Sequence, residues 1–166
     1  VFAVAVDDEP GPAFTMVKPG SLVFSPDSQQ FGYIAIDQGR EFVVINHQAG
    51  KAYDQIVSEQ MAFSPDGKRT AFAARLQAEQ FMVIDGVAGK PYAALMEEPP
   101  VFSPDGGKIA YPAFNGKEWR VILNGVEQAG FSSIGKSSLF FSRTGRLAYI
   151  AKPPAGKWTV VVDGLA

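Results

Sequence analysis

The segment Phe63-Ser64-Pro65-Asp66-Gly67 decides the fold, because it is one of several copies of the same stretch. It recurs as Phe24-Ser25-Pro26-Asp27 and as Phe102-Ser103-Pro104-Asp105, and a weaker copy reads Phe141-Ser142-Arg143-Thr144. These copies start at positions 24, 63, 102 and 141, so each lies 39 residues after the last. A fixed period of this length is typical of repeat architectures, in which each repeat is one supersecondary unit packed on its neighbours.

The same period relates positions outside this segment. It links an apolar, a polar and an aromatic set: Ile45, Ile84, Leu123 and Val162; Asn46, Asp85, Asn124 and Asp163; Tyr53, Tyr92 and Phe131. In the N-terminal piece, Val6, Asp7 and Phe14 stand 39 residues before Ile45, Asn46 and Tyr53. We therefore divide the chain, taken as a single domain of residues 1–166, into repeats of approximately 21–59, 60–98, 99–137 and 138–166. Residues 1–20 supply the third and fourth strands of an incomplete copy.

Each repeat contains four predicted strands, which in the first full copy cover residues 22–25, 31–36, 41–46 and about 52–56. Apolar, β-branched and aromatic residues dominate the second and third strands, and turn residues separate the strands. No helical period is present. The third strands, such as 42–45, are apolar on both faces, which indicates a sheet covered on both sides. The sequence therefore predicts an all-β fold of four-stranded antiparallel units packed face to face.

The turns have a clear chemistry. Proline in Ser-Pro-Asp-Gly presets φ for the first turn corner, and the final glycine takes a positive φ. We interpret the aspartates of these segments as turn residues rather than calcium ligands, since no neighbouring carboxylates complete an ion-binding loop. Asp85-Gly86 and Asn124-Gly125 indicate tight hairpin turns between third and fourth strands. His47 replaces the glycine in the first full copy, and we predict an exposed turn histidine there.

Composition excludes several classes of function. The 15 basic and 17 acidic residues give a net charge of −2, and no basic cluster indicates a nucleic-acid partner. No apolar run approaches the length of a membrane span. The chain has no cysteine and one histidine, so we expect no metal site and no cofactor. Neither a nucleophile motif nor a phosphate-binding loop is present, and we expect this chain not to be an enzyme.

The Phe-Ser-Pro-Asp-Gly segment, a strand such as Ile109-Ala110-Tyr111, and a Val-Val-x-Asp-Gly ending resemble the WD-like β-propeller repeat of the TolB-like class. The resemblance covers nearly the whole chain and implies a toroid of four-stranded blades, about four of them here. It also implies a binding platform or a non-catalytic domain beside a hydrolase, often in the bacterial envelope, so we expect a periplasmic or extracellular protein. The Trp-Asp ending of true WD repeats is absent. Arg143-Thr144 shortens one turn of the last repeat, and a longer loop at 152–156 restores the spacing.

Comparison of the copies separates uniform loops from variable ones. The first–second and third–fourth hairpins are nearly uniform and fall on one face, whereas the second–third and fourth–first loops vary and fall on the other. Variable loops on a rigid scaffold commonly carry binding. We therefore predict a recognition surface on the variable-loop face, at which charge reversal of its basic residues would weaken binding without lowering the melting temperature. Its candidate residues are Arg40, Arg75, Gln77, Glu79, Glu97, Glu98, Lys117, Trp119 and Trp158.

These candidates have structural alternatives. The two tryptophans, at the starts of third strands, would otherwise pack between blades, and Glu97-Glu98 would otherwise be a solvated loop.

The strand count leaves the assembly open, because it exceeds by one strand what a closed ring of four four-stranded blades needs. Either the N-terminal fourth strand closes the last blade of the same chain, or the two ends belong to different rings or chains. Two functions follow: a non-catalytic binding or scaffold module with a protein or peptide partner, and a self-assembling subunit that forms a ring or filament through its terminal strands. A weaker third reading is the propeller gate domain of a serine peptidase.

Overall fold

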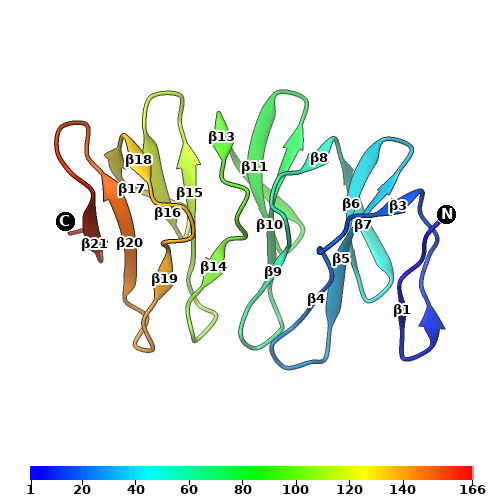
Figure 1. Ribbon diagram of the computed structural model, residues 1–166. Helices are drawn as coiled ribbons and strands as arrows, with labels where there is room; N and C mark the ends of the chain where they lie inside the picture. Colours follow the sequence, from blue (N-terminus) through cyan, green and yellow to red (C-terminus); the bar gives the residue numbers. More distant parts are fainter. Residues whose placement is uncertain (166) are drawn as a thin grey trace.

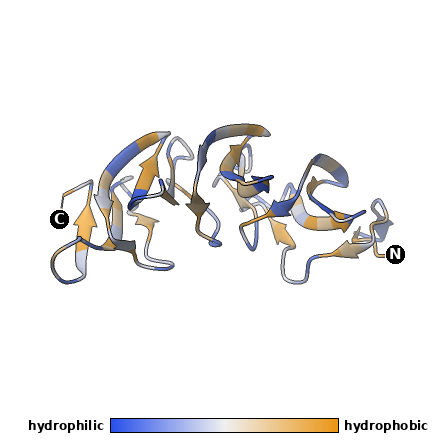
Figure 2. Ribbon diagram, turned by 90° about the horizontal axis from the view of Figure 1, so that it is seen from above, coloured by the Kyte–Doolittle hydropathy of each residue, from blue (hydrophilic) through white to orange (hydrophobic). Residues whose placement is uncertain are grey.

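The computed structural model describes residues 1–165. Every regular element within these residues is a β-strand, and the strands form five antiparallel sheets, so the all-β prediction is confirmed. Figure 1 shows the sheets standing side by side in chain order, with the two termini at opposite ends of the row. Seen from above, the row bends into a shallow arc (Figure 2).

A small N-terminal hairpin precedes four larger sheets, and the first three of these larger sheets share one topology. The hairpin joins β1 (Ala5–Val6) to β2 (Glu9–Pro10). In each following sheet, a long strand pairs on one side with two short strands lying end to end, and on the other side with a third strand that pairs with a fourth. The strands of these three sheets are β3 (Met16–Val17), β4 (Val23–Phe24), β5 (Phe31–Asp37), β6 (Arg40–Ile45) and β7 (Gln48–Tyr53); β8 (Gln55–Ile56), β9 (Ala62–Phe63), β10 (Thr70–Leu76), β11 (Glu79–Ile84) and β12 (Val87–Tyr92); and β13 (Ala94–Leu95), β14 (Val101–Phe102), β15 (Ile109–Phe114), β16 (Trp119–Leu123) and β17 (Val126–Phe131).

The last sheet follows the same plan, but within residues 1–165 its fourth strand is represented only by Leu165, which bridges Val162. Its strands are β18 (Ser133–Ile134), β19 (Phe140–Phe141), β20 (Leu147–Lys152) and β21 (Thr159–Val162). We number these four larger sheets one to four along the chain. The long strands β5, β10 and β15 begin 39 residues apart, at Phe31, Thr70 and Ile109. β20 begins one residue early, at Leu147, because the Arg143-Thr144 turn is shorter.

The inner strand of each sheet is split into two short pieces, and in three sheets a serine occupies the break. Its hydroxyl accepts a hydrogen bond from a backbone N–H of the long strand that would otherwise pair with the inner strand. The donor–acceptor pairs are Ile34 N to Ser21 Oγ (3.0 Å), Ala73 N to Ser58 Oγ (3.2 Å) and Ile150 N to Ser138 Oγ (3.1 Å). The serine therefore satisfies this donor while the strand is interrupted, and in the first two sheets the hydrogen bond is buried.

The predicted fourth strand, residues 52–56, is wrong. The outer strand β7 covers Gln48–Tyr53 and pairs with β6, whereas Gln55–Ile56 already belongs to the second sheet and pairs with β10. Residues 48–51 are exposed, so the outer strand lacks the apolar pattern by which strands are recognised. The chain passes between sheets at Asp54, Ala93 and Ser132, and the repeat boundaries drawn at 21, 60, 99 and 138 lie within the split inner strands.

The Ser-Pro-Asp turns of the first three sheets share one pattern of serine–aspartate hydrogen bonds. In the second sheet, Ser64 Oγ donates to Asp66 Oδ1 (2.6 Å) and accepts from Arg69 N (2.9 Å), while Asp66 Oδ1 also accepts from Lys68 N (3.2 Å). The serine hydroxyl holds the pKa of the Asp66 carboxyl below its usual value. In the fourth sheet Thr144 replaces the aspartate, and its hydroxyl lies 3.0 Å from Ser142 Oγ. The interpretation of these aspartates as turn residues is confirmed.

The tight turns between third and fourth strands are also confirmed. Asp85 and Gly86 have φ values of 51° and 78°, so both central residues adopt the left-handed conformation that this hairpin turn requires. His47 adopts φ 63° in the equivalent turn. The prediction that His47 is exposed is wrong, because its ring is half-buried, with its centroid 4.8 Å from that of Phe31. The ring also lies over Gly11, where a Cβ would overlap it.

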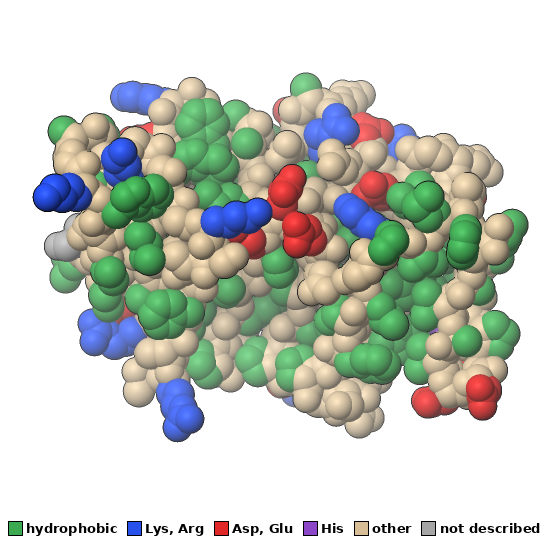
Figure 3. Space-filling model, viewed as in Figure 1, with side chains coloured by type: hydrophobic (Ala, Val, Ile, Leu, Met, Phe, Trp, Pro, Cys, Tyr) green, Lys and Arg blue, Asp and Glu red, His purple; other side chains and the backbone are tan. Residues whose placement is uncertain are grey.

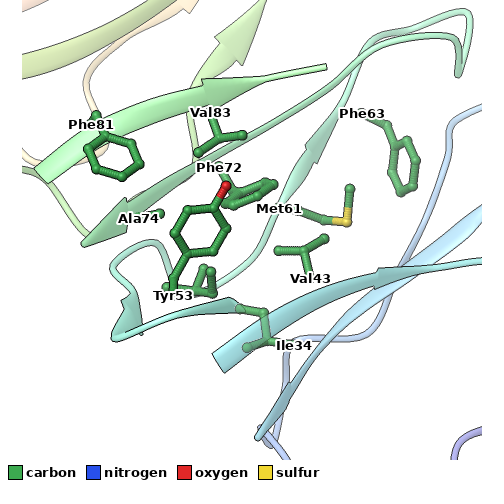
Figure 4. Close-up of a cluster of buried hydrophobic side chains, with 10 residues drawn as sticks. Ile34, Val43, Tyr53, Met61, Phe63, Phe72, Ala74, Phe81 and Val83 are labelled. Carbon is green, nitrogen blue, oxygen red and sulfur yellow. The ribbon is translucent and has the colours of Figure 1, made fainter. Parts of the chain in front are cut away.

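The core lies between successive sheets. Figure 4 shows the first interface, where Ile34 and Val43 of sheet one face Phe72 and Val83 of sheet two, with Tyr53 between the two sheets. Burial of each such side chain stabilises the fold by about 1.5–3 kcal/mol. Equivalent clusters fill the second and third interfaces. A further cluster places Val4 and Phe14, from the N-terminal segment, against sheet one.

A polar contact recurs at each interface beside the apolar cluster. The residue before the long strand donates to the carbonyl of the turn glycine in the next sheet, 37 residues later. The three pairs are Gln30 to Gly67 (2.8 Å), Arg69 to Gly106 (3.5 Å) and Lys108 to Gly145 (3.1 Å). The three interfaces are therefore equivalent in polar as well as apolar contacts.

The ends of the row do not meet. Among the described residues, β21 pairs with β20 and β2 pairs with β1, so β2 does not complete the fourth sheet. The account in which the N-terminal fourth strand closes the last blade of the same chain is therefore wrong for this structure. The termini lie at opposite ends of the arc, too far apart for that pairing (Figure 1).

Candidate functional site

The candidate recognition surface is the edge formed by the turns between second and third strands. Figure 1 shows the turns β5–β6, β10–β11, β15–β16 and β20–β21 together along its upper edge, with the Ser-Pro-Asp turns along the lower edge. We call the upper one the turn edge. Because antiparallel strands alternate in direction, every second hairpin must fall on the same edge.

Two predicted basic residues of the turn edge are held by the scaffold. Arg40 donates from Nε to Tyr53 O and from Nη2 to Ala52 O, both at 3.1 Å, and its Nη1 lies 3.4 Å from Asp54 Oδ1. Arg75 donates from Nε to Gln55 Oε1 at 3.2 Å. Arg40 thus fixes the end of the outer strand, and we expect its substitution to lower stability as well as change the surface.

Other residues of the turn edge are free to contact a partner. The side chains of Gln77, Glu79 and Lys117 are exposed. Within residues 1–165, the side chains of Glu79 and Lys117 make no hydrogen bond or ion pair. Gln77 adopts φ 57°, and its backbone N–H donates to Asp54 Oδ2 at 2.5 Å, which fastens this turn to the segment that joins sheets one and two. The turn edge therefore presents exposed polar side chains on turns that the strands hold in place.

Glu97 and Glu98 lie elsewhere, at the break between β13 and β14 of the inner strand. Figures 1 and 2 place the split inner strands on the concave side of the arc, and acidic side chains gather midway across the face in Figure 3. Glu98 Oε1 accepts a hydrogen bond from Ser137 N at 3.0 Å, which links sheets three and four. Glu97 is exposed, and its carbonyl accepts from Glu59 N at 2.8 Å. Because the break occurs within the inner strand, these glutamates are separated from the turn edge.

This break differs from the other three for a reason visible in the long strand. The position occupied by Ile34, Ala73 and Ile150 is Pro112 in sheet three, and proline has no N–H to donate. No serine is needed at the break, and Glu97-Glu98-Pro99-Pro100 stands there. A pocket lies beside it between sheets three and four, and its lining includes Met96, Glu98, Pro99, Pro112 and Leu139.

The two tryptophans occupy one position in successive sheets. The same position carries Glu41 and Gln80, whose side-chain oxygens each accept a hydrogen bond at 2.7 Å from the inner strand of the next sheet, at Ile56 N and Leu95 N. Trp119 instead packs against the third apolar cluster, with its ring 5.4 Å from that of Phe114. Trp158 is 51% exposed, because no sheet follows it among the described residues. For Trp119, packing between sheets is the observed role.

Two further observations bear on function. Within residues 1–165, no group of three or more His, Cys, Asp or Glu residues is placed to hold a metal ion. The described residues also include no helix long and apolar enough to span a membrane.

Face-to-face antiparallel sheets, each with its inner strand on the concave side of an arc, define the β-propeller class. No protein-family model matches the sequence, and no curated protein matches it. Among solved structures, TolB from Acinetobacter baumannii matches with a TM-score of 0.55 and 16% identity over 87% of this chain and 40% of that one. Puromycin hydrolase matches with a TM-score of 0.57 and 18% identity over 90% of this chain and 27% of that one.

These comparisons concern the fold. The resemblance to TolB-like propellers is confirmed at that level. The chain spans less than half the length of either matched protein, so it corresponds to part of a propeller-containing chain in both cases.

Proposed function

We propose that this chain is a β-propeller segment that serves as a non-catalytic binding or scaffold module and recognises a protein or peptide along its turn edge. In this proposal the chain contributes about four 39-residue repeats of four-stranded blades. The resemblance to TolB-like propellers is the reason to expect a periplasmic or extracellular location, which cell fractionation would test.

One observation carries the proposal, namely the asymmetry between the two edges of the sheets. At the Ser-Pro-Asp edge, three sheets repeat the same serine–aspartate hydrogen bond, so these polar groups are already engaged within the chain. At the turn edge, Glu79 and Lys117 are exposed and the turns differ in sequence from sheet to sheet. Rigid strands that present unlike, unengaged side chains along one edge are suited to recognising a specific partner surface.

Site-specific photo-crosslinking tests the proposal. A benzoylphenylalanine placed at Glu79 or at Lys117 should capture one partner of the same mass in an extract of the source organism. The matched control is Lys68, which is exposed on the opposite edge. Excess unlabelled chain should abolish capture, whereas the double variant Glu79→Lys, Lys117→Glu should compete at least ten-fold less well. Equal capture from Lys68, or equal competition by the double variant, would contradict the proposal.

A further inference from the structure

The pocket between sheets three and four combines an apolar lining with a single charged group. Its volume is about 40 Å³, which is room for a few non-hydrogen atoms, since about 10–15 Å³ holds one water molecule. Among the described residues that line it, Glu98 alone carries a charge. The apolar lining residues are Met96, Pro99, Val101, Ala110, Pro112 and Leu139.

Two prolines make the lining on the side of sheet three apolar. Pro99 stands where sheets one and two have Ser21 and Gln60, whose side chains hydrogen-bond to backbone groups. Pro112 stands where the long strand of each other sheet donates its N–H to a serine. Because proline has no N–H, neither residue adds a backbone donor to the pocket. Both therefore offer a ligand carbon surface that the other sheets do not have at these positions.

Glu98 has one engaged and one free carboxylate oxygen. Its Oε1 accepts a hydrogen bond from the backbone N–H of Ser137 at 3.0 Å, and the Ser137 hydroxyl lies 3.5 Å from the same oxygen. Within residues 1–165, Oε2 of Glu98 accepts no hydrogen bond, and the side chain forms no ion pair. Sheet four therefore holds the carboxylate in place beside the pocket while one oxygen stays available to a ligand.

The charge around the pocket is negative. Glu59 and Glu97 are exposed, and the backbone N–H of Glu59 donates to the carbonyl of Glu97 at 2.8 Å, so these two residues are neighbours across sheets two and three. Lys136 precedes Ser137 in the chain, is exposed, and forms no ion pair within residues 1–165. Three glutamates and one lysine leave an excess of negative charge, which attracts a cationic ligand.

We propose that this pocket binds a lysine side chain of a protein partner, with the methylene groups inside the pocket and the ammonium group on Glu98 Oε2. A lysine side chain has an aliphatic stem and a charged end, which suits an apolar lining beside one carboxylate. Arginine prefers two carboxylate oxygens in a bidentate contact, and Ser137 already occupies one of them. The pocket lies by the inner strands and not on the turn edge, so this inference can fail while the proposed function stands.

Peptide titration followed by NMR gives the first test and needs only the native chain. The probes are blocked tripeptides with glycine on both sides of lysine, arginine or norleucine, which has an aliphatic chain without a charge. The lysine peptide should shift the amide signals of Glu98, Ser137 and Leu139 in a saturable way, and the other two should bind at least three-fold less well. No saturable shift up to about 50 mM lysine peptide, or equal binding of either other peptide, would overturn the proposal.

A matched pair of variants gives the second test. Glu98→Gln removes the charge but keeps an oxygen for the Ser137 N–H, and it should weaken binding of the lysine peptide at least ten-fold. Glu97→Gln makes the same change at an exposed neighbour that does not line the pocket, and it should weaken binding less than three-fold. The amide spectrum of each free variant checks that the fold is kept. Equal losses in the two variants, or undiminished binding by Glu98→Gln, would contradict the assignment.

Discussion

One aromatic ring stands at the same position of the long strand in every sheet: Tyr33, Phe72, Tyr111 and Tyr149. The rings pack between successive sheets, and Tyr53 meets Phe72 edge-on at 5.8 Å between centroids. Burial raises the pKa of Tyr33 and of Tyr149, since an ionised hydroxyl would be poorly solvated. The hydroxyl groups of both lie buried without a hydrogen-bond partner in the described structure. The ring is therefore what this position requires, and Phe72 supplies it without a hydroxyl.

This predicts the effect of removing one hydroxyl. Tyr33→Phe should leave the free energy of unfolding unchanged or raise it by up to about 1 kcal/mol, because an unsatisfied buried polar group is lost. Phe72→Tyr should lower it by about 1–3 kcal/mol for the converse reason. Urea denaturation followed by circular dichroism measures both changes. A loss above 1 kcal/mol in Tyr33→Phe would show that the hydroxyl has a partner.

At the scale of the element, the strands that are buried on both faces are the ones that the sequence predicts best. The long and third strands, which are covered on both faces, were predicted to within a few residues, and so were the Ser-Pro-Asp and Asp-Gly turns. The outer strand was missed because Gln48–Lys51 face solvent and carry no apolar signal. The first piece of the inner strand, β3 at Met16–Val17, was missed because two residues cannot show a period. The role of Arg40 was missed for a related reason, since its partners are backbone carbonyls that leave no trace in sequence.

The turn elements predict a dependence of stability on pH. Serine hydroxyls hold the pKa values of Asp27, Asp66 and Asp105 below the usual value in the folded state. Groups of this kind stabilise the fold above their unfolded pKa, about 4, and the contribution disappears as pH falls through the lower folded pKa. The free energy of unfolding should therefore fall below about pH 4. The triple variant Asp27→Asn, Asp66→Asn, Asp105→Asn should be less stable at pH 7 and show a flatter dependence below pH 4 in urea titrations at several pH values. A triple variant whose dependence matches the native one would contradict this assignment.

At the scale of the whole molecule, the structure is a row of equivalent interfaces with two open ends. The repeat predicted the interfaces, because third strands that are apolar on both faces need a neighbour on each side. It could not predict whether the ends meet, because ring closure depends on the curvature of the arc. The positions of the candidate residues were predicted in part. Gln77, Glu79 and Lys117 lie on the turn edge as expected, whereas Glu97 and Glu98 lie at the break of an inner strand. They were placed with the turn edge because this break was interpreted as a loop between sheets.

The central claim is that the four sheets are equivalent and that, within residues 1–165, the outward face of the fourth sheet is uncovered. The most direct measurement is the free energy of unfolding of Val121→Glu and Val160→Glu, which change the same position of sheets three and four, at concentrations where the chain is a monomer. Val121 is fully buried, so its variant should lose about 4 kcal/mol or more or fail to fold, since an unpaired charge enters the core. Val160 is exposed, so its variant should change stability by less than about 0.5 kcal/mol. Comparable losses in the two variants would show that the face of sheet four is covered within the chain and would contradict the account.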